Sequence, residues 1–135
     1  MRVTHLYTGE IVREKMSREE YLESCRLAII ETASEMLDGR MGFLLGSRAL
    51  WRLLCELGCD AADADVRIFM AIDSETDALP LGEVRQHWDQ AALERLEPEI
   101  REAERWAREA GESACISLIQ RFEAELKKSK RQSDG

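Results

Sequence analysis

The chain lacks any long run of apolar residues. Its longest runs, Leu27–Ile30 and Ile68–Ile72, are far shorter than the roughly 20 apolar residues that a membrane-spanning helix needs. The opening segment, MRVTHLYTGE, also lacks the apolar stretch and the small-residue cleavage site of a secretory signal peptide. We therefore expect a cytoplasmic protein with no membrane partner.

Residues that bind metals are scarce and poorly spaced. Cys55 and Cys59 do not form a C-x-x-C pair, no second ligand pair follows them, and His5 and His87 stand alone. A tetrahedral zinc site needs four soft ligands that converge, so these residues do not predict one. We expect every cysteine to be a reduced thiol, and we predict no metal and no cofactor.

The acidic segment DSETD does not complete a calcium motif either. An EF-hand loop that began at Asp73 would need glycine at its sixth position and glutamate at its twelfth, where this chain has Ala78 and Val84. An extended backbone would place the carboxylates of Asp73, Glu75 and Asp77 on one side. We favour turns that are held by hydrogen bonds and by arginines of the preceding helix over a bound cation.

Catalytic motifs are incomplete as well. The glycines that precede Ser47 lack the Gly-Lys-Ser/Thr ending of a phosphate-binding loop and follow no predicted strand. Ser47, Ser74 and Ser113 have no histidine close to them in sequence, and His87 has no neighbouring acid except Asp89. Because a nucleophile needs a base within hydrogen-bond reach, we assign no catalytic residue, and an enzyme is the less favoured class.

What the chain does have is an excess of acidic residues. Its formal net charge is −8, and 44% of its 135 residues are hydrophobic, enough for the core of one domain over residues 1–135. Residues 1–16 are an ambiguous arm in this prediction, and residues 127–135 are a basic and polar tail that frays. The charge counts against nucleic acid as a partner and favours a basic protein, because acidic surfaces speed the capture of basic partners.

Local start and stop signals predict a mainly α fold, a compact bundle of about four amphipathic helices. Ser17 and Glu20 form a capping box that opens the first helix, and Gly39 stands where a helix commonly ends. The second helix is expected to run from about Met41 to Leu57.

The last third of the chain predicts two further helices. One begins at Asp89 and keeps its apolar phase through Pro98, which either kinks the helix or splits it. The unbroken phase favours the kink. Gly111 is expected to stop this helix and Ser113 to cap the final one, whose apolar face runs to Leu126.

Residues 66–82 are predicted to form an irregular insert. Val66–Ile72 is short and almost wholly apolar, so its pattern does not separate a buried strand from a buried helix. We favour a helix, because no other segment offers a partner strand. Asp63 or Asp65 is suited to cap it, and Asp73–Gly82 reads as a loop.

The second helix carries three small residues, Gly42, Gly46 and Ala49, along one side. A glycine inside a helix costs about 1 kcal/mol relative to alanine, so the favoured explanation is a close approach of the first helix. The alternative is that these residues leave space for a ligand or a partner. The candidate binding residues are the charged and aromatic side chains of this region: Arg48, Trp51, Arg52, Asp73, Glu75, Asp77, Arg85 and Trp88.

Three short patterns in the same region resemble a family of small bacterial proteins of uncharacterised function. They are Gly42-x-x-x-Gly46-x-Arg48-x-Leu50, Asp73-Ser74-Glu75-Thr76-Asp77-x-Leu79-Pro80 and Arg85-x-x-Trp88, and the likeness covers roughly residues 20 to 120. The resemblance implies a compact bacterial cytoplasmic domain. It implies no activity and no functional residues.

These features together favour a binding protein over an enzyme. We predict a small acidic protein that acts by protein–protein interaction, in the manner of an immunity protein or an antitoxin that masks a basic partner. One alternative is an enzyme or a small-ligand sensor with a pocket between the helix at 41–57 and the loop at 73–82. Another is an oligomeric structural module, a homo-oligomer with a broad apolar patch on its last helix.

Overall fold

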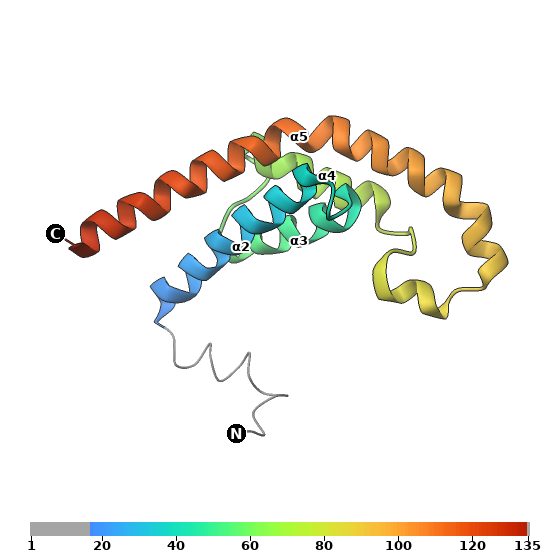
Figure 1. The fold of residues 1–135 in the computed structure, drawn as a ribbon, viewed down its shortest axis with the longest axis horizontal. Helices are drawn as coiled ribbons and strands as arrows, with labels where there is room; N and C mark the ends of the chain where they lie inside the picture. The colour runs from blue at the N-terminus through green and yellow to red at the C-terminus, as the bar shows by residue number, and fades with distance from the viewer. Residues whose placement is uncertain (1–16, 135) are drawn as a thin grey trace, which may run out of the picture.

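Five helices follow one another along residues 17–134, the part of the chain that the computed structural model describes (Figure 1). They are α2 (Arg18–Asp38), α3 (Phe43–Glu56), α4 (Ala64–Thr76), the 3-10 helix η1 (Gly82–His87) and α5 (Gln90–Asp134). These residues contain no strand, so the predicted mainly α bundle is confirmed. The arm expected at residues 1–16 lies outside the described residues.

α2 begins and ends where its local sequence predicts. The hydroxyl of Ser17 accepts a hydrogen bond from the backbone N–H of Glu20 (3.0 Å), and the Glu20 carboxylate accepts one from the backbone N–H of Ser17 (3.1 Å). The bond from the Ser17 backbone N–H is the main cause that lowers the pKa of the Glu20 carboxyl, because it favours the charged form. At the other end, Gly39 has φ 84°, a left-handed conformation that glycine adopts without strain.

The glycines of α3 are sites of close contact between helices. A Cβ atom at Gly46 would lie 2.3 Å from the sulfur of Met36, a fully buried side chain of α2. A Cβ atom at Gly42 would lie 2.8 Å from a carboxylate oxygen of Glu104 on α5. The predicted close approach of the first helix is therefore confirmed at Gly46. The alternative, that these glycines leave space for a ligand, is wrong because neighbouring side chains already fill that space.

Glu104 caps α3 from a distant part of the chain. Gly42 precedes the helix and has no side chain to accept hydrogen bonds from its first amides. The Glu104 carboxylate accepts them instead, from the backbone N–H groups of Phe43 (2.9 Å) and Leu44 (3.2 Å). A negative charge is favourable there, because the N-terminus of a helix carries a partial positive charge. This contact fixes the start of α3 against α5.

Replacing Glu104 with alanine should lower the free energy of unfolding by about 1 to 2 kcal/mol, because two amides at the start of α3 lose their acceptor. Urea unfolding followed by circular dichroism measures the change. Glu109→Ala, which removes an exposed carboxylate from the same helix, is the control and should stay within about 0.5 kcal/mol of wild type. Equal stability of the two variants would mean that the cap adds nothing to the fold.

α4 corrects the prediction of an irregular insert. Val66–Ile72 forms regular helix, and Val66, Phe69 and Ile72 are all fully buried. They recur every third residue, so they share one face of the helix, and α4 packs against both α3 and α5. The segment is therefore one of the core helices. The helix that we favoured over a strand is present. The prediction of an irregular insert is wrong, because the apolar face of this helix packs in the hydrophobic core.

The ends of α4 also differ in part from the sequence prediction. Asp63 is the N-cap, and its carboxylate accepts a hydrogen bond from the backbone N–H of Asp65 (3.0 Å). The helix continues to Thr76, so the first four residues of the predicted loop Asp73–Gly82 are its last turn. The polar composition of that turn, DSET, reflects its position at the end of a helix.

α5 is a single helix of 45 residues where the sequence predicted two. Gly111 does not stop it, because this glycine lies inside the helix where α5 meets the other core helices. A Cβ atom at Gly111 would lie 3.3 Å from the ring of Phe69 and 3.5 Å from Phe43 and Ile72. The residue serves close packing and not chain termination. Pro98 lies exposed within the same helix and does not split it.

α5 joins the bundle together by contacting α2, α3 and α4, and it reaches past them at both ends (Figure 1). Residues 127–134, part of the tail that was expected to fray, belong to this helix. Its buried side chains follow a helical spacing and are Leu93, Ile100, Ala107, Ala114, Cys115, Leu118 and Phe122. Along the described residues, no helix is both long and apolar enough to cross a membrane.

Candidate functional site

Arg48 and Asp73, two of the predicted site residues, contact each other. The Arg48 Nε atom lies 3.5 Å from a carboxylate oxygen of Asp73, and the guanidinium donates to the backbone carbonyl of Thr76 (2.5 Å) and, at 3.5 Å, to that of Leu79. Thr76 is the last residue of α4 and Leu79 lies just beyond it, where no further helical turn supplies N–H donors to the carbonyls. Arg48 therefore ties α3 to the end of α4, and its charge is used within the fold.

Among the described residues, no hydrogen bond or ion pair joins Trp51, Arg52 or Asp77 to this pair. Trp51 is half-buried against the hydrophobic core, Arg52 is exposed on α3, and Asp77 is exposed at the end of α4. The structure thus gives Trp51 a packing role and leaves the two charged side chains at the surface.

Arg85 and Trp88 lie elsewhere, in and just after η1. Figure 1 places this short helix beside the N-terminal end of α5 and away from α3. Arg85 pairs with Glu97 of α5 (3.4 Å), and Trp88 is 40% exposed. The eight predicted residues are therefore spread over three regions of the molecule.

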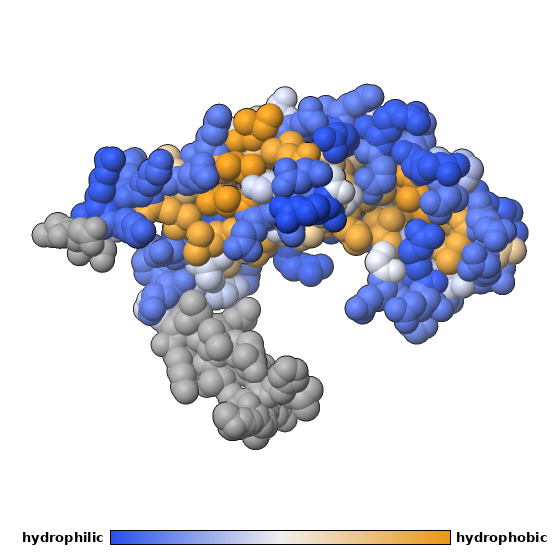
Figure 2. Space-filling model, viewed as in Figure 1, coloured by the Kyte–Doolittle hydropathy of each residue, from blue (hydrophilic) through white to orange (hydrophobic). Residues whose placement is uncertain are grey.

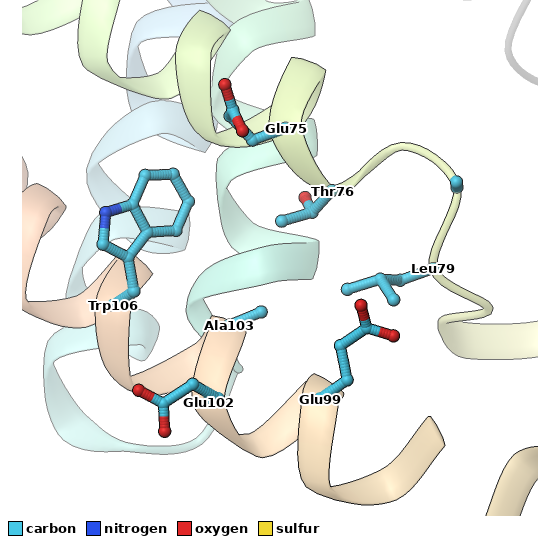
Figure 3. A pocket seen from close by; sticks show the side chains of 8 residues that line it. Glu75, Thr76, Leu79, Glu99, Glu102, Ala103 and Trp106 are labelled. Carbon is cyan, nitrogen blue, oxygen red and sulfur yellow. The ribbon is translucent and has the colours of Figure 1, made fainter. Parts of the chain in front are cut away.

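A groove lies between the end of α4 and the N-terminal half of α5, and Glu75 is the predicted residue that contributes to it (Figure 3). Its volume is about 450 Å³. The residues that line it are Glu75, Thr76, Ala78, Leu79, Glu99, Glu102, Ala103 and Trp106. This is within the size range of protein sites that bind small molecules or a few side chains of a partner.

The groove combines an apolar floor with an acidic rim. Leu79, Ala103 and the 40%-exposed indole of Trp106 supply the apolar surface. Figure 3 shows Glu75 on the α4 side and Glu102 on the α5 side, with the indole between them. An arrangement of this kind repels anions and attracts a cation that also carries apolar surface.

The acidic side chains of the rim are largely available to a partner. Glu75 and Glu99 form no ion pair or hydrogen bond with any other side chain in the described part of the chain. Glu102 pairs with Arg105 (2.7 Å), but both side chains are about two-thirds exposed, at 70% and 66%. Exposed pairs of this kind contribute little energy, so a partner's cation can replace Arg105 at small cost.

Three charged or aromatic residues of the groove were not predicted from the sequence. Glu99, Glu102 and Trp106 follow the spacing i, i+3 and i+7, which places them on one face of a helix. That spacing was a usable signal for an acidic and aromatic stripe. What the sequence could not show is that this stripe faces Glu75 and Leu79 across a groove.

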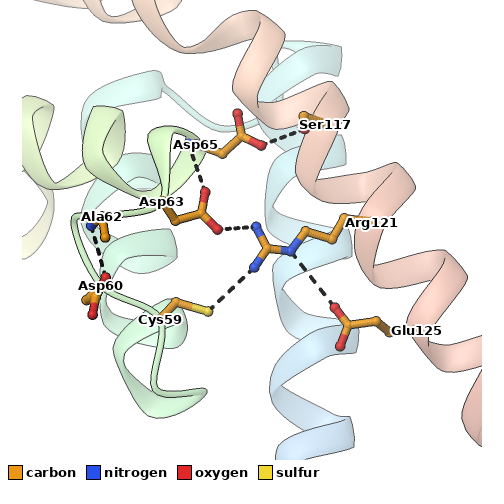
Figure 4. A network of polar contacts seen from close by, with 8 residues as sticks. All are labelled: Cys59, Asp60, Ala62, Asp63, Asp65, Ser117, Arg121 and Glu125. Atoms are coloured by element: carbon orange, nitrogen blue, oxygen red, sulfur yellow. Dashed lines mark hydrogen bonds and ion pairs between the residues drawn. The ribbon is translucent and has the colours of Figure 1, made fainter.

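A second polar cluster joins the start of α4 to the C-terminal half of α5 (Figure 4). Arg121 donates to the Asp63 carboxylate (2.6 Å) and lies 3.9 Å from that of Glu125, and Ser117 donates to Asp65 (2.6 Å). The hydrogen bond from Arg121 is the main cause that lowers the pKa of Asp63. Asp63 is also the N-cap of α4, so this cluster positions two helices.

Cys59 and Cys115 are not reactive thiols at neutral pH. All four cysteines are free, and burial raises the pKa of Cys59 and raises that of Cys115 to about 12. The thiolate is the reactive form of cysteine, and these two side chains remain protonated at neutral pH. Cys59 also accepts a long contact from Arg121 (4.0 Å).

No metal centre is formed among residues 17–131, whose side chains the structure describes. The acidic segment cannot hold a cation in the way an extended backbone would allow, because Asp73–Thr76 is helical. Asp73 pairs with Arg48, Glu75 lines the groove and Asp77 follows the helix. Their three carboxylates therefore do not form one cluster. His5 lies outside the described residues, and His87 is exposed at the end of η1.

No family model, curated protein or solved structure matches this chain.

Proposed function

We propose that the protein is an acidic binding protein that acts by protein–protein interaction and masks a basic surface of its partner, in the manner of an immunity protein or an antitoxin. The observation that carries this proposal is the groove between α4 and α5, where carboxylates surround an apolar floor and an exposed indole. Exposed tryptophans are frequent anchors of protein interfaces. Opposite charges steer partners together and set which partner is accepted.

An enzyme or a small-ligand sensor is the less favoured alternative. It required a pocket between α3 and the 73–82 segment, with the space beside the glycines open to a ligand. Met36 and Glu104 occupy the space beside Gly46 and Gly42. Arg48 and Asp73, which would have held a ligand there, contact each other and the backbone of α4.

A second candidate function, an oligomeric structural module, has one observation in its favour. Leu27 on α2 and Ile116 on α5 are 47% and 46% exposed. Figure 2 shows apolar side chains at the surface over the part of the molecule where α2 and α5 lie. Sedimentation of the purified protein distinguishes this candidate, since a structural module would form a stable oligomer on its own.

The proposed function is tested by capture from the native cytoplasm with two variants of equal charge. Glu75→Lys with Glu99→Lys reverses the rim of the groove at its two unpaired carboxylates. Glu31→Lys with Glu123→Lys reverses two exposed carboxylates elsewhere, Glu123 being about 25 Å from Trp106 along α5. Each variant changes the formal net charge from −8 to −4, because each Glu→Lys substitution adds two positive charges.

We expect wild type and the Glu31/Glu123 variant to capture the same basic protein, and the Glu75/Glu99 variant to lose it. The captured protein is then purified and its binding measured by calorimetry at increasing salt, which should weaken binding through screening. Circular dichroism confirms that each variant is folded. If wild type recovers only copies of itself, or a partner whose binding does not depend on salt, the masking function is wrong.

A further inference from the structure

We infer that the groove recognises an arginine flanked by apolar residues in an exposed segment of the partner protein. This inference rests on the proposed function and names the chemistry by which the same site selects its partner. The binding site is the groove lined by Trp106, Glu75, Glu102, Glu99 and Leu79. Its basis is the complementarity between these side chains and a guanidinium on an apolar stem.

The indole of Trp106 supplies the first half of the recognition. It is 40% exposed and borders the groove, so a flat cation can stack on its face. Cations are attracted to the face of tryptophan more than to that of any other side chain. A guanidinium stacks better than an ammonium, because it is planar and less strongly hydrated. The indole therefore favours arginine over lysine.

The carboxylates supply the second half. Glu75 lies on the α4 side of the groove, and Glu102 lies about one turn before Trp106 on α5 (Figure 3). A guanidinium on the indole would have a carboxylate available on each side, and arginine presents several N–H donors that suit carboxylates. Glu99, one turn before Glu102 and Ala103 on α5, extends the acidic rim toward Leu79. A phosphate group would meet like charge at all of these positions, so nucleic acid does not fit.

The floor of the groove explains why apolar neighbours are needed. Leu79 and Ala103 lie beside the rim and offer apolar surface that water covers poorly. The methylene stem of arginine and one adjacent apolar side chain would cover this surface. A simple metal cation lacks this apolar complement, and a polyamine has neither a planar guanidinium nor an adjacent apolar side chain, so a protein segment is the occupant to which the geometry points.

The test uses a short synthetic peptide with leucines on one helical face and arginines on the other, labelled for fluorescence anisotropy. Companion peptides replace every arginine with lysine or with citrulline, which keeps the shape of arginine and removes its charge. We expect the order arginine, lysine, citrulline in decreasing affinity. Trp106→Ala should weaken binding of the arginine peptide by about threefold to thirtyfold, the range of a cation on an aromatic face.

Nuclear magnetic resonance locates the site. The indole N–H signal of Trp106, assigned by its absence from Trp106→Phe, should shift on addition of the arginine peptide while those of Trp51 and Trp88 stay in place. The Glu75→Lys/Glu99→Lys variant should lose binding, and the Glu31→Lys/Glu123→Lys variant should keep it. Equal binding of the citrulline peptide, or an unmoved Trp106 signal, would overturn the inference.

The outcome separates this inference from the proposed function. If a basic partner is captured but binds the Glu75/Glu99 variant unchanged, the masking function stands and the groove is not its site. If the peptide binds at Trp106 but no basic partner exists, the recognition chemistry stands and the masking function fails. If the Trp106 signal shifts on concentration of the protein alone, the occupant is a second copy, through basic residues such as Lys127 and Lys130 of α5, and the inference is wrong.

Discussion

Phe69→Ala is expected to lower the free energy of unfolding by about 3 to 5 kcal/mol, the usual cost of removing a buried aromatic ring. The Phe69 side chain is fully buried in α4 and lies against Gly111 of α5. Its removal leaves a cavity where two core helices meet. Because small domains are stable by only about 5 to 15 kcal/mol, this change is a large share of the total.

Chemical unfolding followed by circular dichroism measures this effect. Phe69→Leu, which keeps most of the apolar volume, should remain folded and lose less stability, so the series can be measured even if alanine unfolds the protein. Val84→Ala removes an apolar side chain that is 47% exposed on η1, and it should change stability by less than about 0.5 kcal/mol. A loss at Phe69→Ala as small as that at Val84→Ala would show that α4 is not a core helix.

Gly46→Ala is expected to destabilise the protein by about 1 to 3 kcal/mol, the cost of overpacking a core. The added Cβ atom would lie 2.3 Å from the sulfur and 2.5 Å from Cγ of Met36. Met36 is fully buried, so its side chain has no free space into which to move. The direction of the change in stability is informative, because alanine stabilises an exposed helical site by about 1 kcal/mol relative to glycine.

The source of that loss is tested by a second substitution. Met36→Ala alone should cost about 2 to 5 kcal/mol through the cavity that it leaves. With both substitutions present, the new Cβ at Gly46 partly fills that cavity, so the double variant should be more stable than the sum of the two losses predicts. Leu45→Ala, at an exposed position of α3, is the control. If the two losses of stability simply add, the destabilisation by Gly46→Ala does not come from contact with Met36.

Sequence reasoning succeeded where a helix end depends on its own neighbours. The capping box of Ser17 and Glu20, the left-handed Gly39 and the Asp63 cap are all set by residues within a few positions of one another. It failed where a residue's role depends on what packs against it. Gly111, like Gly39, was predicted to end a helix from its local sequence. It instead lies beside Phe69 in the core, and the helix continues through it.

The candidate site was predictable only in part for the same reason. The acidic segment that contains Glu75 was visible in sequence, and so was the spacing of Glu99, Glu102 and Trp106 on one helical face. Their meeting across a groove depends on α5 running unbroken past the end of α4. Arg48 pairs with Asp73 as expected. Its guanidinium also donates to the backbone carbonyl of Thr76 at the end of α4, so this side chain stabilises the fold.

The central claim is that the groove between α4 and α5 binds a basic segment of a partner protein. A charge exchange across the interface tests it most directly, with the captured partner and its interface arginine changed to glutamate. That partner variant should lose binding to wild type and recover it with the Glu75→Lys/Glu99→Lys protein, as measured by calorimetry. Recovery requires the two charges to face each other. If the exchanged pair binds no better than either single variant, the groove is not where this protein meets its partner.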